Sequence, residues 1–274
     1  MTATSFATGS RALAAYGGEA VWRESGAVEA DVAAGGLLFR WKRMRPLPRM
    51  VVRADTANPI LRLDPVDHDG HVGVLDGRSV RIETRDGALV DSRADARDRF
   101  PYGRRLISWD SLDLTYFLGY ALWNYLTLPA LLLRDDIAWR EVAGSTLEAE
   151  FPSHLPTHCQ RQTFYFDADT GLLDRLDYTA EVFGGWAHAA HLVTEHQERD
   201  GVRFASSRRV VPRVGSTALD GPPLIWAEVR DAQLLPLVSP SDERASTRPT
   251  QGLPRRARDA PGCRTCRPRG AAGR

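Results

Sequence analysis

Turn signals divide this chain into many short segments in which apolar and polar residues alternate. An alternation with a period of two predicts strands that are buried on one face, and glycine-containing turns join neighbouring strands into antiparallel hairpins. The chain is therefore predicted to be mainly β, with an antiparallel sheet. The turn signals are Gly35-Gly36, Asp69-Gly70, Asp76-Gly77, Asp86-Gly87, Gly144-Ser145, Asp169-Thr170-Gly171 and Asp200-Gly201.

The predicted strands form two groups on either side of one long apolar segment. A sheet with this many strands must curl or close on itself. The first group comprises 22–34, 37–44, 49–55, 59–64, 71–75 and 79–85, and the second comprises 137–143, 146–152, 157–167, 172–182, 187–198, 203–213 and 224–235.

The 20 residues from Leu114 to Leu133 carry no formal charge, and such a length can span a bilayer. Asn124 and Pro129 interrupt this segment, and acidic as well as basic residues flank it, which favours a buried helix over a transmembrane one. Ser108 can cap a helix, and apolar residues then recur around much of its circumference. We predict one buried helix at 109–125 that ends before Pro129.

Only the concave side of a curled sheet offers enough apolar surface to bury such a helix. The predicted fold is therefore a curled antiparallel sheet, or half-open barrel, with one long apolar helix packed in its mouth. Residues 1–20 show little pattern and are predicted to be a weakly structured N-terminus, while 21–240 form a single domain of sheet and helix.

Residues 241–274 are rich in Pro, Gly and Arg, with nine arginines and three acidic residues. A segment with so few large apolar residues cannot bury enough surface to order itself, so it is predicted to be a disordered tail. Cys263 and Cys266 form a CxxC pair within it. Because no second pair or surrounding fold accompanies them, we interpret this pair as incidental rather than as a zinc or redox site.

The hairpin sequence FYFDADTGLLDRLDY at 164–178 follows LEAEFP at 147–152. It resembles the Phe-Asp…Thr-Gly-Leu hairpin of bacterial lipoprotein carriers with the LolA-type fold. That resemblance implies a curled antiparallel sheet, plugged by helices, around a cavity for lipid acyl chains. WDSLDLTYFLGYALWNYLT at 109–127 and DYTAEVFGGWAHAAH at 177–191 also resemble a group of uncharacterised bacterial cytoplasmic proteins. The resemblance covers residues 20–235.

An aromatic and polar set on the helix and a following strand predicts the wall of a lipophilic pocket. Tyr and Trp offer a flat apolar surface with one hydrogen-bonding tip, and a buried amide such as that of Asn124 requires partners. The same residues suit an ordinary core helix, so the pattern leaves both interpretations open. The predicted ligand-binding residues are Trp109, Tyr116, Tyr120, Trp123, Asn124, Gln160, Gln162 and Phe164.

Titratable residues on the strands after the helix offer a catalytic alternative. Histidine, carboxylate and arginine side chains that converge in a cavity can transfer protons. On a solvated face the same residues form a cross-strand charge ladder, which we weigh above catalysis because the sequence does not decide which face is concave. The candidate catalytic residues are His158, Asp177, Tyr178, Glu181 and Arg208.

Several function classes receive no support from the chain. Its 36 basic residues nearly balance 35 acidic ones, so the overall charge does not predict nucleic-acid binding. Motifs for nucleotide binding, serine hydrolysis and HExxH zinc sites are missing. His158 and Cys159 are adjacent and point to opposite sides of a strand, which argues against a shared metal. We therefore predict no cofactor and no metal.

The leading prediction is the binding of a hydrophobic or amphipathic small molecule in the cavity of the sheet. The alternative is a cofactor-free cyclase or isomerase of a lipophilic metabolite in bacterial specialised metabolism. A third interpretation is peripheral membrane contact through 114–133 and the basic tail. Residues 1–18 lack the pattern of a secretory signal, so we expect a cytoplasmic location, and the sequence leaves the oligomeric state open.

Overall fold

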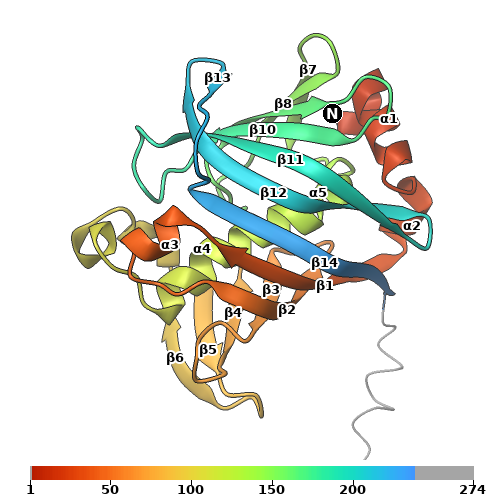
Figure 1. The fold of residues 1–274 in the computed structure, drawn as a ribbon. Helices are drawn as coiled ribbons and strands as arrows, with labels where there is room; N and C mark the ends of the chain where they lie inside the picture. Colours follow the sequence, from red (N-terminus) through yellow and green to blue (C-terminus); the bar gives the residue numbers. More distant parts are fainter. Residues whose placement is uncertain (1, 238–274) are drawn as a thin grey trace, which may run out of the picture. The chain divides into compact units, whose positions relative to one another are not determined.

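A curled antiparallel sheet of 14 strands dominates the computed structural model, which describes residues 2–237 (Figure 1). The strand order is β6-β5-β4-β3-β2-β1-β14-β12-β11-β10-β9-β8-β7, and β13 pairs with β12 beside this path. The strands are β1 (Ser25–Gly35), β2 (Leu47–Asp55), β3 (Ile60–Asp64), β4 (Val72–Asp76), β5 (Ser79–Glu83), β6 (Leu89–Arg93), β7 (Ala138–Glu141), β8 (Thr146–Glu150), β9 (Arg161–Phe166), β10 (Leu173–Thr179), β11 (His188–Arg199), β12 (Val202–Val214), β13 (Thr217–Ala218) and β14 (Ile225–Pro236).

Two meanders make up this sheet: β1 to β6 form the first, β7 to β14 form the second, and a single long-range pairing joins them. β1 runs antiparallel to β14, from Ser25 opposite Pro236 to Gly35 opposite Trp226. The other pairings join strands that follow one another closely in the chain. Because β6 and β7 remain at its two edges, the sheet is curled but open, which confirms the predicted mainly antiparallel architecture.

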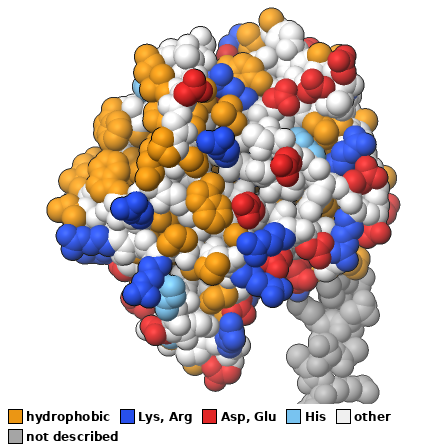
Figure 2. All heavy atoms as spheres, in the orientation of Figure 1, with side chains coloured by type: hydrophobic (Ala, Val, Ile, Leu, Met, Phe, Trp, Pro, Cys, Tyr) orange, Lys and Arg blue, Asp and Glu red, His pale blue; other side chains and the backbone are white. Residues whose placement is uncertain are grey.

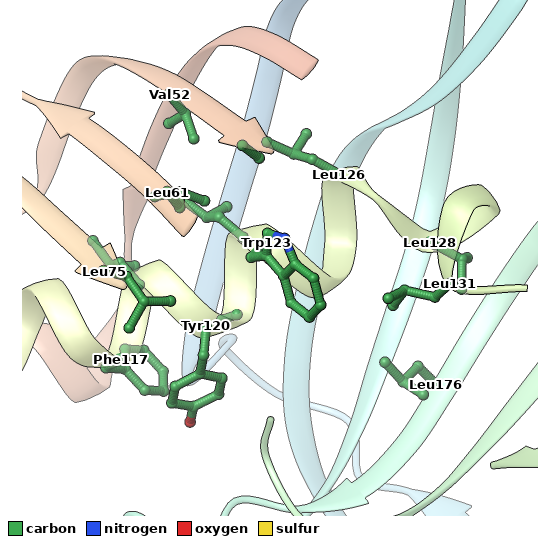
Figure 3. Packing of buried hydrophobic residues seen from close by; sticks show 14 of the residues in the cluster. Val52, Leu61, Leu75, Phe117, Tyr120, Trp123, Leu126, Leu128, Leu131 and Leu176 are labelled. Carbon is green, nitrogen blue, oxygen red and sulfur yellow. The ribbon is translucent and has the colours of Figure 1, made fainter. Parts of the chain in front are cut away.

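Helix α4 (Ser111–Leu126) packs in the hollow of the curled sheet, where it contacts strands β2 to β6 and β12. All of its residues except Ser111 and Tyr125 are buried. Figure 3 shows Leu61 and Leu75 of the first meander directed toward the aromatic side chains of this helix. The apolar stripe is wide because the sheet surrounds the helix, and this confirms the predicted buried helix.

Two glycines allow α4 to lie very close to β4. A Cβ atom on Gly119 would lie 2.9 Å from Cβ of Leu75, and one on Gly73 would lie 2.5 Å from Oγ1 of Thr115. Both distances are shorter than a normal carbon contact, so no larger residue fits there without displacing the helix.

The ends of α4 follow from local chemistry. Asp110 is the N-cap, since its carboxylate accepts a hydrogen bond from the backbone N–H of Asp113 at 2.7 Å, and the Asp113 carboxylate accepts one from the N–H of Asp110. The predicted cap at Ser108 is therefore wrong by two residues, because a capping box at 110 and 113 satisfies more backbone donors. The helix ends before Pro129, as predicted, and a short α5 (Leu128–Leu131) follows.

The N-terminus is folded, contrary to the prediction of weak structure for 1–20. Leu13 and Tyr16 are buried, and the Tyr16 hydroxyl accepts a hydrogen bond from the backbone N–H of Leu173 at 3.1 Å. Small residues form this segment, so it packs closely without a strong apolar pattern. The helices outside α4 and α5 are η1 (Ala3–Ser5), α1 (Ala7–Ala15), α2 (Glu19–Arg23), α3 (Leu37–Trp41), η2 (Ala96–Arg99) and η3 (Gly103–Leu106).

Two predicted strands differ from the structure. The segment 37–44 contains helix α3, because Gly36 at φ +128° turns the chain away from β1 and the N–H of Leu38 then donates to the carbonyl of Leu224. The strand predicted at 157–167 begins only at Arg161. The residues before it form a turn that the Gln162 side chain stabilises by donating to a backbone carbonyl at 3.1 Å. β6 was not predicted.

The predicted tail at 241–274, with Cys263 and Cys266, lies outside the described residues. Among the helices of residues 2–237, none has both the length and the apolar character needed to cross a bilayer. The apolar segment 114–133 instead supplies most of α4 and all of α5, and α4 is buried within the sheet.

Candidate ligand-binding site

An apolar cavity of about 340 Å³ lies between α4 and strands β10, β11, β12 and β14. Successive turns of α4 supply one wall with Phe117, Ala121 and Tyr125. Helix α3 and the loop between β10 and β11 border the cavity with Trp41 and Trp186. The cavity thus lies where the second meander curls over the helix.

Small side chains explain why a cavity remains at this point of an otherwise well-packed core. Five alanines line the cavity, and each is buried. An alanine side chain ends at Cβ, so opposing alanines on the helix and the sheet leave volume that larger residues fill elsewhere in the core. They are Ala34, Ala121, Ala180, Ala189 and Ala227.

Three polar side chains meet where α4 approaches the cavity. The Tyr125 hydroxyl is hydrogen-bonded to Nε2 of His158 at 2.6 Å and to the hydroxyl of Tyr178 at 3.2 Å. The imidazole of His158 stacks on the ring of Tyr178, with centroids 3.7 Å apart and an interplanar angle of 6°. On its other side, Nδ1 of His158 is hydrogen-bonded to the Tyr120 hydroxyl at 3.3 Å. We call Tyr125, His158 and Tyr178 the polar floor of the cavity.

The polar floor is uncharged at neutral pH. Burial lowers the pKa of His158 well below its usual value, because the imidazolium would be desolvated and faces the positive charge of Arg97. Burial also raises the pKa of Tyr125 to about 12 and that of Tyr178 well above its usual value. A neutral imidazole has one donor and one acceptor nitrogen, and both nitrogens of His158 are already hydrogen-bonded to tyrosine hydroxyls. The neutral hydrogen-bonding capacity that remains for a bound molecule therefore lies on the hydroxyls of Tyr125 and Tyr178.

A buried guanidinium lies behind the polar floor. Arg208 donates to the backbone carbonyl of Tyr125 at 3.1 Å and lies over the ring of Tyr125, 4.9 Å from its centroid. Its Nη1 also lies 3.2 Å from Nε2 of His191, and burial lowers the pKa of that imidazole well below its usual value. In the described chain its hydrogen-bond partners are therefore neutral, and its Nε has none.

None of the described residues that line the cavity is an aspartate or glutamate, but one carboxylate lies behind its wall. Among those lining residues Arg213 is charged, and its Nε lies 3.4 Å from the Asp177 carboxylate, with which it forms an ion pair. Arg208 adds a positive charge one aromatic ring away from the cavity. Because Arg213 is ion-paired, Arg208 is the cation near the cavity without a carboxylate partner, and its charge would favour an uncharged or anionic ligand group over a cationic one.

The candidate catalytic residues separate in the structure. His158 and Tyr178 both line the cavity, and Arg208 lies behind the floor. Asp177 is buried in an ion pair with an arginine of its own strand at 2.6 Å, and Glu181 is exposed and paired with an arginine of η2. The two carboxylates thus belong to ion pairs, while the histidine and the tyrosine share the cavity.

The predicted ligand-binding residues of the helix region lie around the cavity rather than in its wall. Tyr120 contacts the polar floor through His158. Trp109 and Tyr116 stack on phenylalanines of the core, and the Trp123 indole donates to a backbone carbonyl at the end of β2 at 2.8 Å. The Asn124 amide nitrogen donates to two backbone carbonyls, while its Oδ1 is buried without a hydrogen-bond partner among the described residues.

The predicted residues around β9 also lie outside the cavity wall. Gln160 is exposed, and Gln162, in β9, is buried with its side chain hydrogen-bonded to the turn that precedes the strand. Phe164 is buried against the indole of Trp139, with centroids 5.3 Å apart. His158 was placed on the same strand as these residues, but it lies in the preceding turn.

Sequence reasoning missed most of the cavity wall, including Tyr125. Positions 117, 118, 121, 122 and 125 share one helical face by their spacing, with the small Ala121 at its centre. A small residue flanked by aromatic ones on a buried face was the available signal. The bordering tryptophans, Trp41 and Trp186, gave no local signal, because the fold brings them together.

No family model and no curated protein matches this chain by sequence. Solved structures with a similar fold include a LolA superfamily protein from Nitrosomonas europaea, with 11% identity, a TM-score of 0.49, and coverage of 87% of this chain and 96% of that chain. A DUF1329 family protein from Desulfovibrio piger is similar over 85% of this chain and 94% of that chain, with 12% identity and a TM-score of 0.41.

Proposed function

We propose that this protein binds a hydrophobic or amphipathic small molecule in the cavity between α4 and the second meander. The observation that carries this proposal is the apolar cavity of about 340 Å³. Pockets for small molecules usually have volumes of a few hundred Å³, apolar walls and a small number of placed polar groups. The cavity has all three properties, and the polar floor supplies the placed groups.

The arrangement of the cavity orients the bound molecule. Its apolar part fits the wall formed by Phe117, Ala121 and the facing strands, because burial of apolar surface stabilises that contact by about 25 cal/mol per Å². Its polar end fits against Tyr125, His158 and Tyr178, where unpaired polar groups of the ligand find hydrogen-bond partners. The positive charge of Arg208 behind the floor favours an acidic polar end.

A cofactor-free cyclase or isomerase is a second candidate, and the hydrogen-bonded floor favours it. A buried neutral imidazole next to two tyrosine hydroxyls can accept and return a proton. In such an enzyme, His158 and Tyr178 of the predicted catalytic residues would transfer the proton, with Tyr125 as their hydrogen-bond partner. Its test is conversion of a bound lipophilic substrate, which His158→Gln should abolish while binding remains.

Displacement of a fluorescent fatty acid tests the binding proposal. Parinaric acid should bind the wild-type protein, and unlabelled palmitate should displace it. Ala121→Phe places a ring in the cavity and should weaken parinaric acid binding by roughly tenfold or more. Ala88→Phe, on an exposed turn, is the matched control and should bind as the wild type does.

Native mass spectrometry of the freshly purified protein gives an independent readout. A bound lipophilic molecule in the wild type and Ala88→Phe, but not in Ala121→Phe, would support the cavity as its site. Equal binding of parinaric acid by all three proteins, each with a wild-type circular dichroism spectrum, would overturn the proposal.

A further inference from the structure

Large apolar side chains are exposed around the opening of the cavity. Trp41 of α3 is 53% exposed, Trp186 of the loop between β10 and β11 is 69% exposed, and Val214 at the end of β12 is 67% exposed. All three also line the cavity, so they lie around one opening although they come from three separate elements. Exposed tryptophans that gather at one site mark an interaction surface.

The apolar surface continues beyond the opening. The Lys42 ammonium group, next to Trp41, donates to the backbone carbonyls of Arg105 and Leu106 at 2.8 and 2.9 Å. This contact places the exposed Leu106 and Ile107 beside α3. In Figure 2, hydrophobic side chains gather on the left side of the molecule, which is the side of α3 in Figure 1. We call this surface, formed by Leu37, Trp41, Leu106, Ile107, Trp186 and Val214, the rim.

Basic residues accompany the rim, and acidic residues are missing from its segments. The stretches 36–54, 102–109, 182–194 and 209–219 contain no aspartate or glutamate. Within 36–54 there are six basic residues, of which Arg40, Arg43 and Arg45 are exposed around α3 and form no ion pair with the described residues. In the whole chain 36 basic residues face 35 acidic ones, so this imbalance is local to the rim.

We propose that the rim docks onto the surface of a membrane that contains anionic phospholipids. Tryptophan side chains are favoured at the depth of the lipid headgroups, and exposed arginines near them bind the headgroup phosphates. In that orientation the cavity opens toward the acyl chains, so a lipophilic molecule can enter or leave without crossing water. This surface differs from the one predicted from the sequence, because α4 of the segment 114–133 is buried and the basic tail lies outside the described residues.

This inference adds a partner to the proposed function, and a vesicle assay separates the two. The full chain is mixed with vesicles of phosphatidylcholine, with or without phosphatidylglycerol, and bound protein is collected by flotation. We expect binding only when phosphatidylglycerol is present, and weaker binding at high salt. Arg40→Gln/Arg43→Gln/Arg45→Gln should weaken it roughly tenfold or more.

The matched charge control is Arg23→Gln/Arg199→Gln. Both are exposed, outside the rim segments, and one lies in α2 while the other ends β11. This variant should float almost as the wild type does. The triple arginine variant should still take up parinaric acid from solution, because these arginines do not line the cavity. If the wild type takes up no parinaric acid, the proposed function is wrong. If the wild type takes up parinaric acid but does not float with vesicles, only the proposed membrane docking of the rim is wrong.

The apolar part of the rim is tested in the same assay. Trp41→Ser/Trp186→Ser should reduce flotation, and brominated lipids should quench the wild-type tryptophan fluorescence more than that of this variant. Leu89→Ser/Val90→Ser removes two exposed apolar side chains of β6 and should have little effect. If both rim variants float as the wild type does, or if no vesicle binds the wild type, the proposal is wrong.

Discussion

Two buried polar clusters lie near opposite ends of α4, and they differ in how their charges are balanced. At the N-terminal end, the fully buried Asp113 carboxylate accepts hydrogen bonds from Arg93 and Arg105, each at 2.6 Å, and from Arg104 at 2.9 Å. At the C-terminal end, the buried Arg208 contacts a neutral imidazole and a backbone carbonyl. One cluster pairs opposite charges, and the other leaves a positive charge without a carboxylate.

We interpret this difference as one between a structural role and the proposed binding role. The Asp113 cluster joins β6 and η3 to the first turn of α4, and it also completes the capping box. Such a network fixes the position of the helix. The Arg208 cluster adjoins the polar floor instead, where a ligand can supply the missing negative charge. The first cluster therefore stabilises the fold, while the second places a positive charge beside the site of the proposed ligand.

The largest expected effect is the loss of the Asp113 charge. Asp113→Asn keeps the shape of the side chain but leaves the half-buried Arg105 without a carboxylate, and it leaves Arg93 and Arg104 with Asp110 alone. We expect the free energy of unfolding to fall by about 4 kcal/mol, since breaking a buried ion-pair network exposes uncompensated charge. Urea denaturation measures this free energy of unfolding. The control Asp98→Asn, on an exposed ion pair, should cost less than about 1 kcal/mol, and equal losses in both variants would contradict the comparison.

The second prediction concerns the buried imidazole of the polar floor. Burial lowers the pKa of His158 well below the 6.5 of an exposed histidine, so the unfolded chain binds a proton that the folded chain rejects as the pH falls below 6.5. Stability is therefore lost on acidification. At about pH 5 this histidine should contribute roughly 2 kcal/mol of that loss.

His158→Gln should reduce the loss of stability between neutral pH and about pH 5 by that amount, as measured by urea denaturation at both values. His68→Gln, on an exposed side chain, is the control and should keep the wild-type pH dependence. An unchanged pH dependence in His158→Gln would show that the imidazole is not held neutral by burial.

Local chemistry explains why most of the sheet could be predicted from the sequence. Asp76-Gly77 and Asp200-Gly201 lie between the paired strands β4 and β5 and between β11 and β12, and positive φ angles at both glycines match the predicted turns. The alternation of apolar residues wrongly predicted a strand from Leu37. Three apolar residues at every second position also fit a short helix once Gly36 reverses the chain.

The candidate site was harder to predict, because long-range pairing assembles it. Nothing local indicates that β1 pairs with β14, yet this pairing brings Ala34 and Ala227 into one cavity wall. Likewise, Tyr125 and His158 come from a helix and a distant turn, and only the fold brings them within 2.6 Å. His158 and Tyr178 are predicted site residues because their side chains are titratable, while the alanines that form the cavity carry no such signal.

The smallest expected effect on stability comes from removing the charge of Arg208. Arg208→Met loses its contacts with His191 and the carbonyl of Tyr125, but it also relieves the desolvation of a cation that has no carboxylate. These terms oppose each other, so the free energy of unfolding should change by less than about 1 kcal/mol. A loss as large as that of Asp113→Asn would mean that both clusters serve the fold.

The same variant should have a clear effect on binding. If Arg208 attracts the polar end of a ligand, then Arg208→Met should weaken the binding of ionised parinaric acid several-fold while it leaves its uncharged methyl ester almost unaffected. Fluorescence titration with both probes measures the difference, and Arg209→Met, the exposed neighbour on β12, is the matched control. Equal weakening of both probes would assign Arg208 a packing role, because a charge interaction must distinguish an anion from its ester.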